Sequence, residues 1–339
     1  MITATSVADL ECGFETAAGG PGHDGGVLGA VEYCDRVGGP IVRDGRPFMA
    51  MPMGDEDMTR FTEVWRAGTS VVTGQHRGLA YACDGEYLFL CGRTGEDADL
   101  ATATEEAYLA AFEVVRLLGY PHLARMWNMV HGINDPDGRG GDVYGRFCQG
   151  RAMAFERGGV PPGMLPAATC VGSHGGGVAF YLLATRTPRA VHIENPRQTP
   201  AYRYPPKYGV KAPSFARATY LAAPDGTGRL FVSGTASIVG SETVHVGDMA
   251  RQTTTTLENI AVLVGRENLS RYGIDADLSL RDLDGVKVYV KRKADIPVAR
   301  RICAEVFGPS AAVAYVNVDI CRDDLLVEIE AVAPRVRPA

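Results

Sequence analysis

The stretch Leu88-Phe89-Leu90-Cys91-Gly92 returns later in the chain as Leu230-Phe231-Val232-Ser233-Gly234. Each copy is a short apolar run that ends in glycine and comes after a Tyr-containing run, which is typical of a hairpin entering a sheet. A motif that returns once after a long interval indicates a duplicated structural unit. The fold can therefore be worked out by comparing the segments behind the two copies.

The elements expected behind each motif come in the same order, namely a helix, a strand, a second helix and a final hairpin. They span residues 105–118, 125–130, 143–155 and 167–184 in the first copy, and residues 248–263, 286–290, 297–307 and 312–332 in the second. The sequence therefore predicts an α/β (α+β) fold with two ββαβαββ units, in which mixed sheets pack on helices.

These units set the expected domain organisation. Residues 76–186 form the first, degenerate unit, and residues 214–339 form the second. A Pro-rich connection, residues 187–213, joins them, and residues 1–75 are predicted to be an N-terminal extension that is partly loop. A Gly-rich loop is expected over residues 17–29.

Bulk composition narrows the function classes. The net charge of −6 gives no overall footprint for nucleic acid. Eight Cys without a CxxC pair, and no signal peptide, predict reduced thiols in a cytoplasmic protein. No apolar run has the length of a membrane span. The chain offers no P-loop, HExxH, zinc spacing or Gly-x-Ser-x-Gly elbow, so we expect neither a metal nor an organic cofactor.

Residues 214–335 resemble the RidA (YjgF) family. The resemblance rests on residues 230–234, Gln252 with residues 257–259, residues 286–290 and residues 327–333. It implies a sheet-and-helix unit of the kind that forms trimers with clefts between subunits. The family's carboxylate-binding Arg would fall at about Val313, so the resemblance does not extend to RidA deaminase chemistry.

The longer chain resembles the chorismatases, which place a RidA-like domain behind a related N-terminal part. The matching stretches are residues 144–152, 195–198, 213–218, 233–237 and 321–328. The resemblance implies an enzyme that cleaves chorismate, releasing pyruvate, and a monomer whose interior imitates the RidA trimer. We expect the 3-hydroxybenzoate synthase type; a hydrolase forming a dihydroxycyclohexadienoate and a non-enzymatic RidA-like binding protein are the alternatives.

Glu328 is the candidate acid. In an alternating strand Glu328 and Glu330 share one face, and burial of that face would raise the pKa of one carboxyl. The pattern alone also allows both to face solvent. Protonation of the enol ether needs a positioned acid, and the resemblance places the catalytic Glu at Glu328. Glu330 is assigned a structural role.

Several residues are candidates for binding the two carboxylates of chorismate. Tyr144 and Arg151 lie two helical turns apart and therefore share a face, although a surface Arg beside a half-buried Tyr fits the pattern as well. The resemblance implies substrate binding at both. Arg301 is expected to be the second anchor; Arg300 adjoins it, so one of the two could instead face solvent. One of Tyr204 and Tyr208 is expected to contribute a phenol, with preference for Tyr208.

Gly234 and Cys321 are the candidates for product choice. Glycine in a strand often marks a bend or a close backbone approach, and a lone Cys is often a small core residue. The resemblance implies more, because 3-hydroxybenzoate synthases pair Gly at 234 with Cys at 321, where the hydrolases tend to carry Ala at both. Gly234 would leave room beside the substrate ring.

Overall fold

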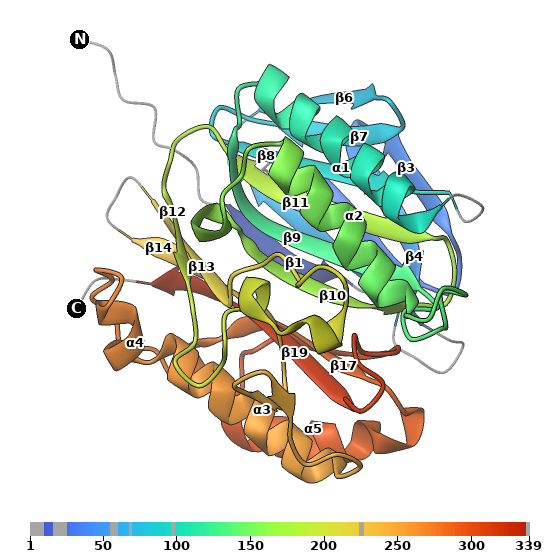
Figure 1. Cartoon of the computed structure of the whole chain (residues 1–339). Coiled ribbons are helices and arrows are strands. Elements are labelled where there is room, and N and C mark those ends of the chain that lie inside the picture. The colour runs from blue at the N-terminus through green and yellow to red at the C-terminus, as the bar shows by residue number, and fades with distance from the viewer. Residues whose placement is uncertain are drawn as a thin grey trace.

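The computed structural model describes residues 10–15, 26–54, 60–67, 70–95, 99–223 and 227–336. Its strands form three larger sheets, and one hydrophobic core lies between them. Helices cover the outer faces of two of these sheets (Figure 1). The arrangement confirms the predicted α+β fold with mixed sheets packed on helices and an interior that imitates a trimer.

The first predicted unit is a six-stranded sheet in the order β10-β9-β11-β8-β7-β6, with β9 and β10 parallel. Its elements are β6 Val72–His76, β7 Leu79–Cys83, β8 Tyr87–Arg93, α1 Leu100–Leu117, β9 His122–His131, α2 Val143–Arg157, η1 Pro162–Met164, β10 Ala167–Ser173 and β11 Val178–Thr185. Helix α1 begins upstream of its predicted start because the Asp99 side chain accepts a hydrogen bond from the Thr102 amide and caps the helix there.

The second predicted unit is a six-stranded sheet in the order β12-β13-β14-β19-β17-β18, with β17 and β18 parallel. Its elements are β12 Ala190–Ile193, η2 Ala201–Arg203, η3 Pro206–Tyr208, β13 Ala218–Ala222, β14 Gly228–Ala236, β15 Ile238–Val239, β16 Glu242–Thr243, α3 Met249–Val264, α4 Arg266–Ser270, η4 Leu280–Asp282, β17 Asp284–Val290, η5 Lys293–Asp295, α5 Ile296–Val306, β18 Val313–Asn317 and β19 Val327–Val336. Asp248 caps α3 as predicted.

The N-terminal segment, expected to be partly loop, supplies a third sheet in the order β1-β5-β2-β4-β3. Its strands are β1 Glu11–Glu15, β2 Gly26–Cys34, β3 Gly38–Arg43, β4 Arg46–Pro52 and β5 Phe61–Ala67. The expected Gly-rich loop is strand from Gly26 onward, and residues 17–25 lie outside the described residues.

The topology of this sheet repeats that of the other two without their helices. Strands β1, β2, β4 and β5 pair in the pattern of β8, β9, β10 and β11, with β2 and β4 as the parallel pair. Strand β3 lies between β2 and β4 in the chain, as α2 lies between β9 and β10 in the first predicted unit. The chain therefore contains three related sheets around one core, of which the sequence revealed two.

Buried ion pairs connect the three sheets at their centre. Lys287 of β17 lies 2.5 Å from Glu63 of β5 and 2.7 Å from Glu330 of β19, measured from Nζ to the carboxylate oxygens. Arg125 of β9 lies 2.9 Å from the second oxygen of Glu330. All four side chains are buried. Removing one member of such a pair typically costs about 3–5 kcal/mol, so the cluster fixes how the sheets meet.

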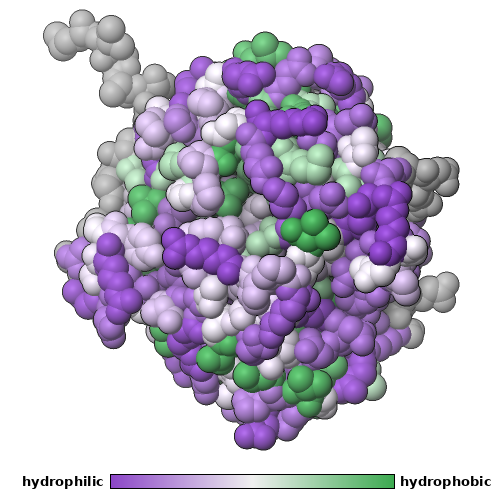
Figure 2. Space-filling model, in the orientation of Figure 1, coloured by the Kyte–Doolittle hydropathy of each residue, from purple (hydrophilic) through white to green (hydrophobic). Residues whose placement is uncertain are grey.

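The surface is mixed in character. On the face shown in Figure 2, hydrophobic residues are scattered among hydrophilic ones. Within the described ranges, no helix is long and apolar enough to span a membrane.

Candidate active site

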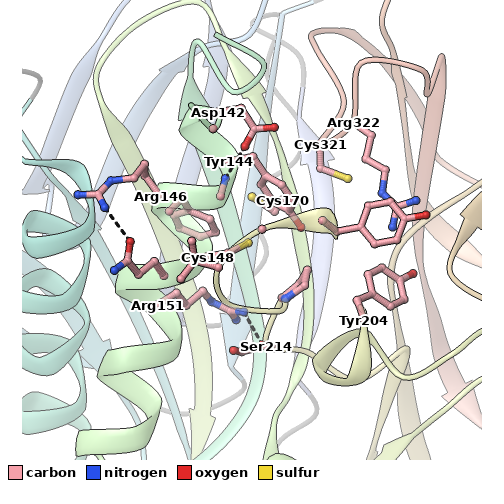
Figure 3. Close-up of a pocket in the computed structure, with 18 of the residues that line it drawn as sticks. Asp142, Tyr144, Arg146, Cys148, Arg151, Cys170, Tyr204, Ser214, Cys321 and Arg322 are labelled. Carbon is pink, nitrogen blue, oxygen red and sulfur yellow. Dashed lines mark hydrogen bonds between the residues drawn. The ribbon is translucent and has the colours of Figure 1, made fainter. Parts of the chain in front are cut away.

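A cavity of about 940 Å³ lies where the two predicted units meet. Helix α2 and strand β10 of the first unit line one side, and β14 and β19 of the second unit line the other. The chain between η2 and β13 closes it, together with the turn before β19 (Figure 3). The site therefore lies between two related units of the same chain.

Glu328 reaches this cavity from β19 and is only 4% exposed. Burial raises the pKa of its carboxyl to about 8, and the nearby Glu330 carboxylate adds to the effect. Cys321 Sγ, 3.8 Å from Glu328 Oε2, is the hydrogen-bonding partner that the described residues offer it. A carboxyl in this environment keeps its proton at neutral pH and can act as a general acid.

Gly234 lies on β14 against the carboxyl of Glu328. A Cβ placed on Gly234 would come 1.9 Å from Glu328 Oε1 and 3.2 Å from Thr169 Cγ2. The Gly234 amide donates a hydrogen bond to Thr169 Oγ1 at 3.0 Å. The space beside Gly234, which we expected to accommodate the substrate ring, is therefore filled by the carboxyl of Glu328.

Three thiols line the same cavity, from Cys148 on α2, Cys170 on β10 and Cys321 before β19 (Figure 3). Burial raises the pKa of the Cys148 thiol to about 12 and holds the other two above their ordinary values as well. All three are therefore neutral thiols at physiological pH, which are small, weakly polar groups. They form a wall that offers little to bind water.

Arg151 and Tyr144 line the cavity from one face of α2, as predicted. Arg151 is 3% exposed, and its guanidinium donates to the Ser214 carbonyl and contacts Met126 Sδ at 3.5 Å. Its Nε has no hydrogen-bonding partner, and no carboxylate among the described residues pairs with it. A buried cation without an anion is costly, so this position suits an anionic ligand.

The opposite side of the cavity carries two more arginines. Arg217 is buried and donates from Nη2 to the Tyr204 hydroxyl at 2.7 Å. Arg322 stacks on Tyr208, with Cζ 3.8 Å from the ring centroid. Arg217 Nε and Arg322 Nη2 are buried without hydrogen-bonding partners in the described structure. Tyr204 and Tyr208 therefore lie at the site as expected, where they orient guanidinium groups.

Arg301 does not reach the site. It is exposed on α5, outside the lining of the cavity. Helix α5 is the repeat equivalent of α2, but only α2 faces the cleft that contains Glu328, so equivalent positions in the two units face different surroundings. Arg300 is also exposed, and its guanidinium stacks on Tyr315 at 4.9 Å.

Arg217 and Arg322 were not predicted from the sequence, and their positions explain why. One lies directly before β13 and the other in the turn before β19, so neither falls on a periodic face that pattern analysis could identify. The signal for Arg217 was its place in the matching stretch 213–218.

Among the described residues, no group of three or more His, Cys, Asp or Glu side chains is arranged to hold a metal ion.

The fold and the cavity together define a class of protein. Its described residues form three related sheets, with a cleft that combines a buried acid with cationic groups that have no carboxylate partner there. Such a site is equipped to bind a small polycarboxylate and to protonate it.

Comparisons with known proteins identify the family. The family model described as "Chorismatase FkbO/Hyg5-like, N-terminal" matches residues 63–184. A 3-hydroxybenzoate synthase from Streptomyces hygroscopicus is 47% identical over 309 residues, which cover 90% of this chain and 91% of that protein. A chorismatase crystal structure matches with a TM-score of 0.93 at 44% identity, covering 97% of this chain and 100% of that one. The chain belongs to the chorismatase family and is an enzyme.

The predicted RidA relationship also appears in these comparisons. The 3-aminoacrylate deaminase RutC of Acinetobacter baylyi is 30% identical over 118 residues, 34% of this chain and 86% of that protein.

Proposed function

We propose that this chain converts chorismate to 3-hydroxybenzoate and pyruvate, with Glu328 as the general acid. The observation that carries the proposal is the neutral, buried carboxyl of Glu328 in a cavity lined by cationic side chains. Cleavage of an enol ether begins with proton transfer to its methylene carbon, and a carboxyl with a pKa of about 8 retains that proton at neutral pH. The name of the Streptomyces hygroscopicus synthase supports the same reaction.

The arginines of the cavity can bind the two carboxylates of the substrate. Chorismate carries two carboxylates, and we assign one to Arg151 and the other to Arg217 with Arg322. These groups approach the cavity from opposite sides and have buried nitrogen atoms without partners in the described residues. Tyr144 lies two helical turns before Arg151 on the same face of α2 and can donate a further hydrogen bond. Held at both ends, the substrate would present its methylene to Glu328.

Product choice depends on what happens after protonation. The cation that forms on the enolpyruvyl carbon can be attacked by water, which yields pyruvate and a dihydroxycyclohexadienoate and consumes one water. Alternatively, the ring 4-hydroxyl loses its proton and attacks the neighbouring ring carbon that bears the enolpyruvyl oxygen. The bond between that carbon and oxygen breaks, pyruvate leaves, and a strained epoxide remains on the ring. The epoxide opens, its oxygen takes up a proton and the ring loses one, which gives 3-hydroxybenzoate with no net consumption of water. A preplaced internal nucleophile has a large advantage in effective concentration. The neutral thiol wall with Cys321 favours this second course because it holds water poorly.

The test is to incubate the purified protein with chorismate and to separate the products against standards. We expect equal amounts of pyruvate and 3-hydroxybenzoate. A dihydroxycyclohexadienoate as the main product would assign the chain to the hydrolase type instead. Absence of pyruvate would refute the proposed reaction altogether.

A further inference from the structure

The carboxyls of Glu328 and Glu330 lie two residues apart on the same face of β19 but have very different surroundings. Glu330 accepts hydrogen bonds from Trp127 Nε1 at 2.9 Å, from Arg125 Nη2 at 2.9 Å and from the Thr169 hydroxyl. Lys287 Nζ lies 2.7 Å from it. Donors therefore surround Glu330, while the described residues offer Glu328 one thiol.

This difference decides which carboxyl is ionised. Burial alone would raise the pKa of Glu330, but Lys287 and Arg125 outweigh that effect and hold its pKa below the ordinary value. Lys287 in turn stays charged despite its burial, because Glu330 and Glu63 both lie against it. The cluster thus contains two carboxylates and two cations, and its charge is balanced while Glu328 is neutral.

We propose that Glu330 is a positioning residue for the reaction: its carboxylate, fixed by Arg125 and Lys287, keeps the neighbouring Glu328 in the acid form. If Glu328 were ionised as well, the cluster would hold three carboxylates but only two cations. The balance extends to the N-terminal sheet, because Glu63 of β5 neutralises the far side of Lys287. This inference rests on the proposed role of Glu328 as the general acid, and it assigns to the N-terminal sheet a part in the chemistry.

Other groups near Glu328 do not replace this effect. The titratable or charged groups that act on it or line the same cavity, besides Glu330, are Arg125 of β9, Cys170 of β10, Arg217 before β13, Tyr289 of β17, Cys321 and Arg322 before β19, and Tyr144, Cys148 and Arg151 of α2. The thiols and the phenols in this set are neutral. Arg125 and Arg217 favour an ionised Glu328, so among these groups the Glu330 charge is what opposes them.

The test is Glu330→Gln, which removes the charge and keeps the size of the side chain. The remaining cations would then favour ionisation of Glu328, lowering its titration midpoint by roughly one to three pH units. The alkaline limb of kcat/KM for pyruvate release should shift to lower pH by the same amount. Activity lost at pH 7 should return at pH 5, a recovery that a merely structural defect would not give.

A readout that needs no turnover separates this inference from the proposed function. Glu328 in the acid form contributes a carboxylic C=O band to the infrared spectrum. The difference spectrum between the wild type and Glu328→Gln identifies this band. We expect this band at pH 7 in the wild-type protein and its loss at pH 7 in Glu330→Gln. If the band titrates at the same pH in both, the inference is wrong whether or not chorismate is cleaved. If the band shifts but no pyruvate forms, only the proposed function fails.

Two further variants guard against a folding defect. Trp127→Phe removes one hydrogen bond from Glu330 but leaves its charge, so the alkaline limb should stay in place. Glu63→Gln removes a negative charge from the far side of Lys287, on another sheet, and should shift the limb in the same direction by a smaller amount. A Glu63→Gln limb identical to that of the wild type would overturn the charge-balance argument even if Glu330→Gln did not fold.

Discussion

Replacing Gly234 alone with Ala, with Cys321 kept, should disable the acid by pushing the added methyl group against the carboxyl of Glu328. A Cβ at this position would lie 1.9 Å from Glu328 Oε1, whereas ordinary contacts begin at 3.4 Å. The Glu328 carboxyl must therefore retreat by about 1.5 Å or the strand must move. A misplacement of about 1 Å at a reacting group can cost roughly 100-fold in rate, so we expect kcat/KM to fall by about that factor. Pyruvate release, coupled to lactate dehydrogenase, gives the measurement.

The control is Gly163→Ala, because Gly163 has open space around the added methyl and an ordinary backbone conformation. This variant should retain wild-type kcat/KM. Urea unfolding of both variants would separate a displaced carboxyl from a destabilised protein. If Gly234→Ala folds normally and keeps kcat/KM within threefold of wild type, the inference that the carboxyl of Glu328 needs the space beside Gly234 is wrong.

The site leads to three other predictions. Glu328→Gln should lower kcat by about 10²–10⁴-fold. The folded chain holds the Glu328 proton more tightly than the unfolded chain, so this proton stabilises the fold fully below the ordinary pKa and progressively less as pH rises through about 8. Between pH 7 and 9 the free energy of urea unfolding should therefore fall by roughly 1.4 kcal/mol more in the wild type than in the variant. Arg151→Ala should raise KM by the equivalent of about 1.5–3 kcal/mol, and Arg301→Ala should leave it unchanged; equal KM values in steady-state assays would contradict this. Cys321→Ala should divert product toward the dihydroxy acid by admitting water, and an unaltered chromatographic ratio would remove Cys321 from product choice.

The sequence predicted the elements that carry strong periodicity. The two helical units were visible because α1 and α3 each combine an apolar stripe with a following Gly, and α3 also has a capping Asp; the capping Asp99 of α1 was not recognised in the sequence. The N-terminal sheet has no helices between its paired strands, so its relation to the other sheets left no signal in the order of elements. Its strands became evident only through their pairing, with β2 parallel to β4.

The sequence predicted site residues only where local spacing determines which way their side chains point. The shared helical face of Tyr144 and Arg151 could be read from the sequence, and the structure places both in the cavity. Alternation also placed Glu328 and Glu330 on one face, but it could not tell a buried face from an exposed one. That depends on Lys287 and on other residues far away in the chain, whose approach is a tertiary property.

Comparison of the two units shows what distinguishes the reactive cleft. Gly92 occupies in β8 the place that Gly234 occupies in β14, and a Cβ there would come 2.5 Å from the ring of Phe180 on the neighbouring strand β11. Both glycines therefore make room for a side chain from the adjacent antiparallel strand. In the first unit that side chain is an aromatic ring in the hydrophobic core, and in the second it is the carboxyl of Glu328. The glycine is thus a feature of the fold, and the chemistry depends on which side chain fills the space beside it.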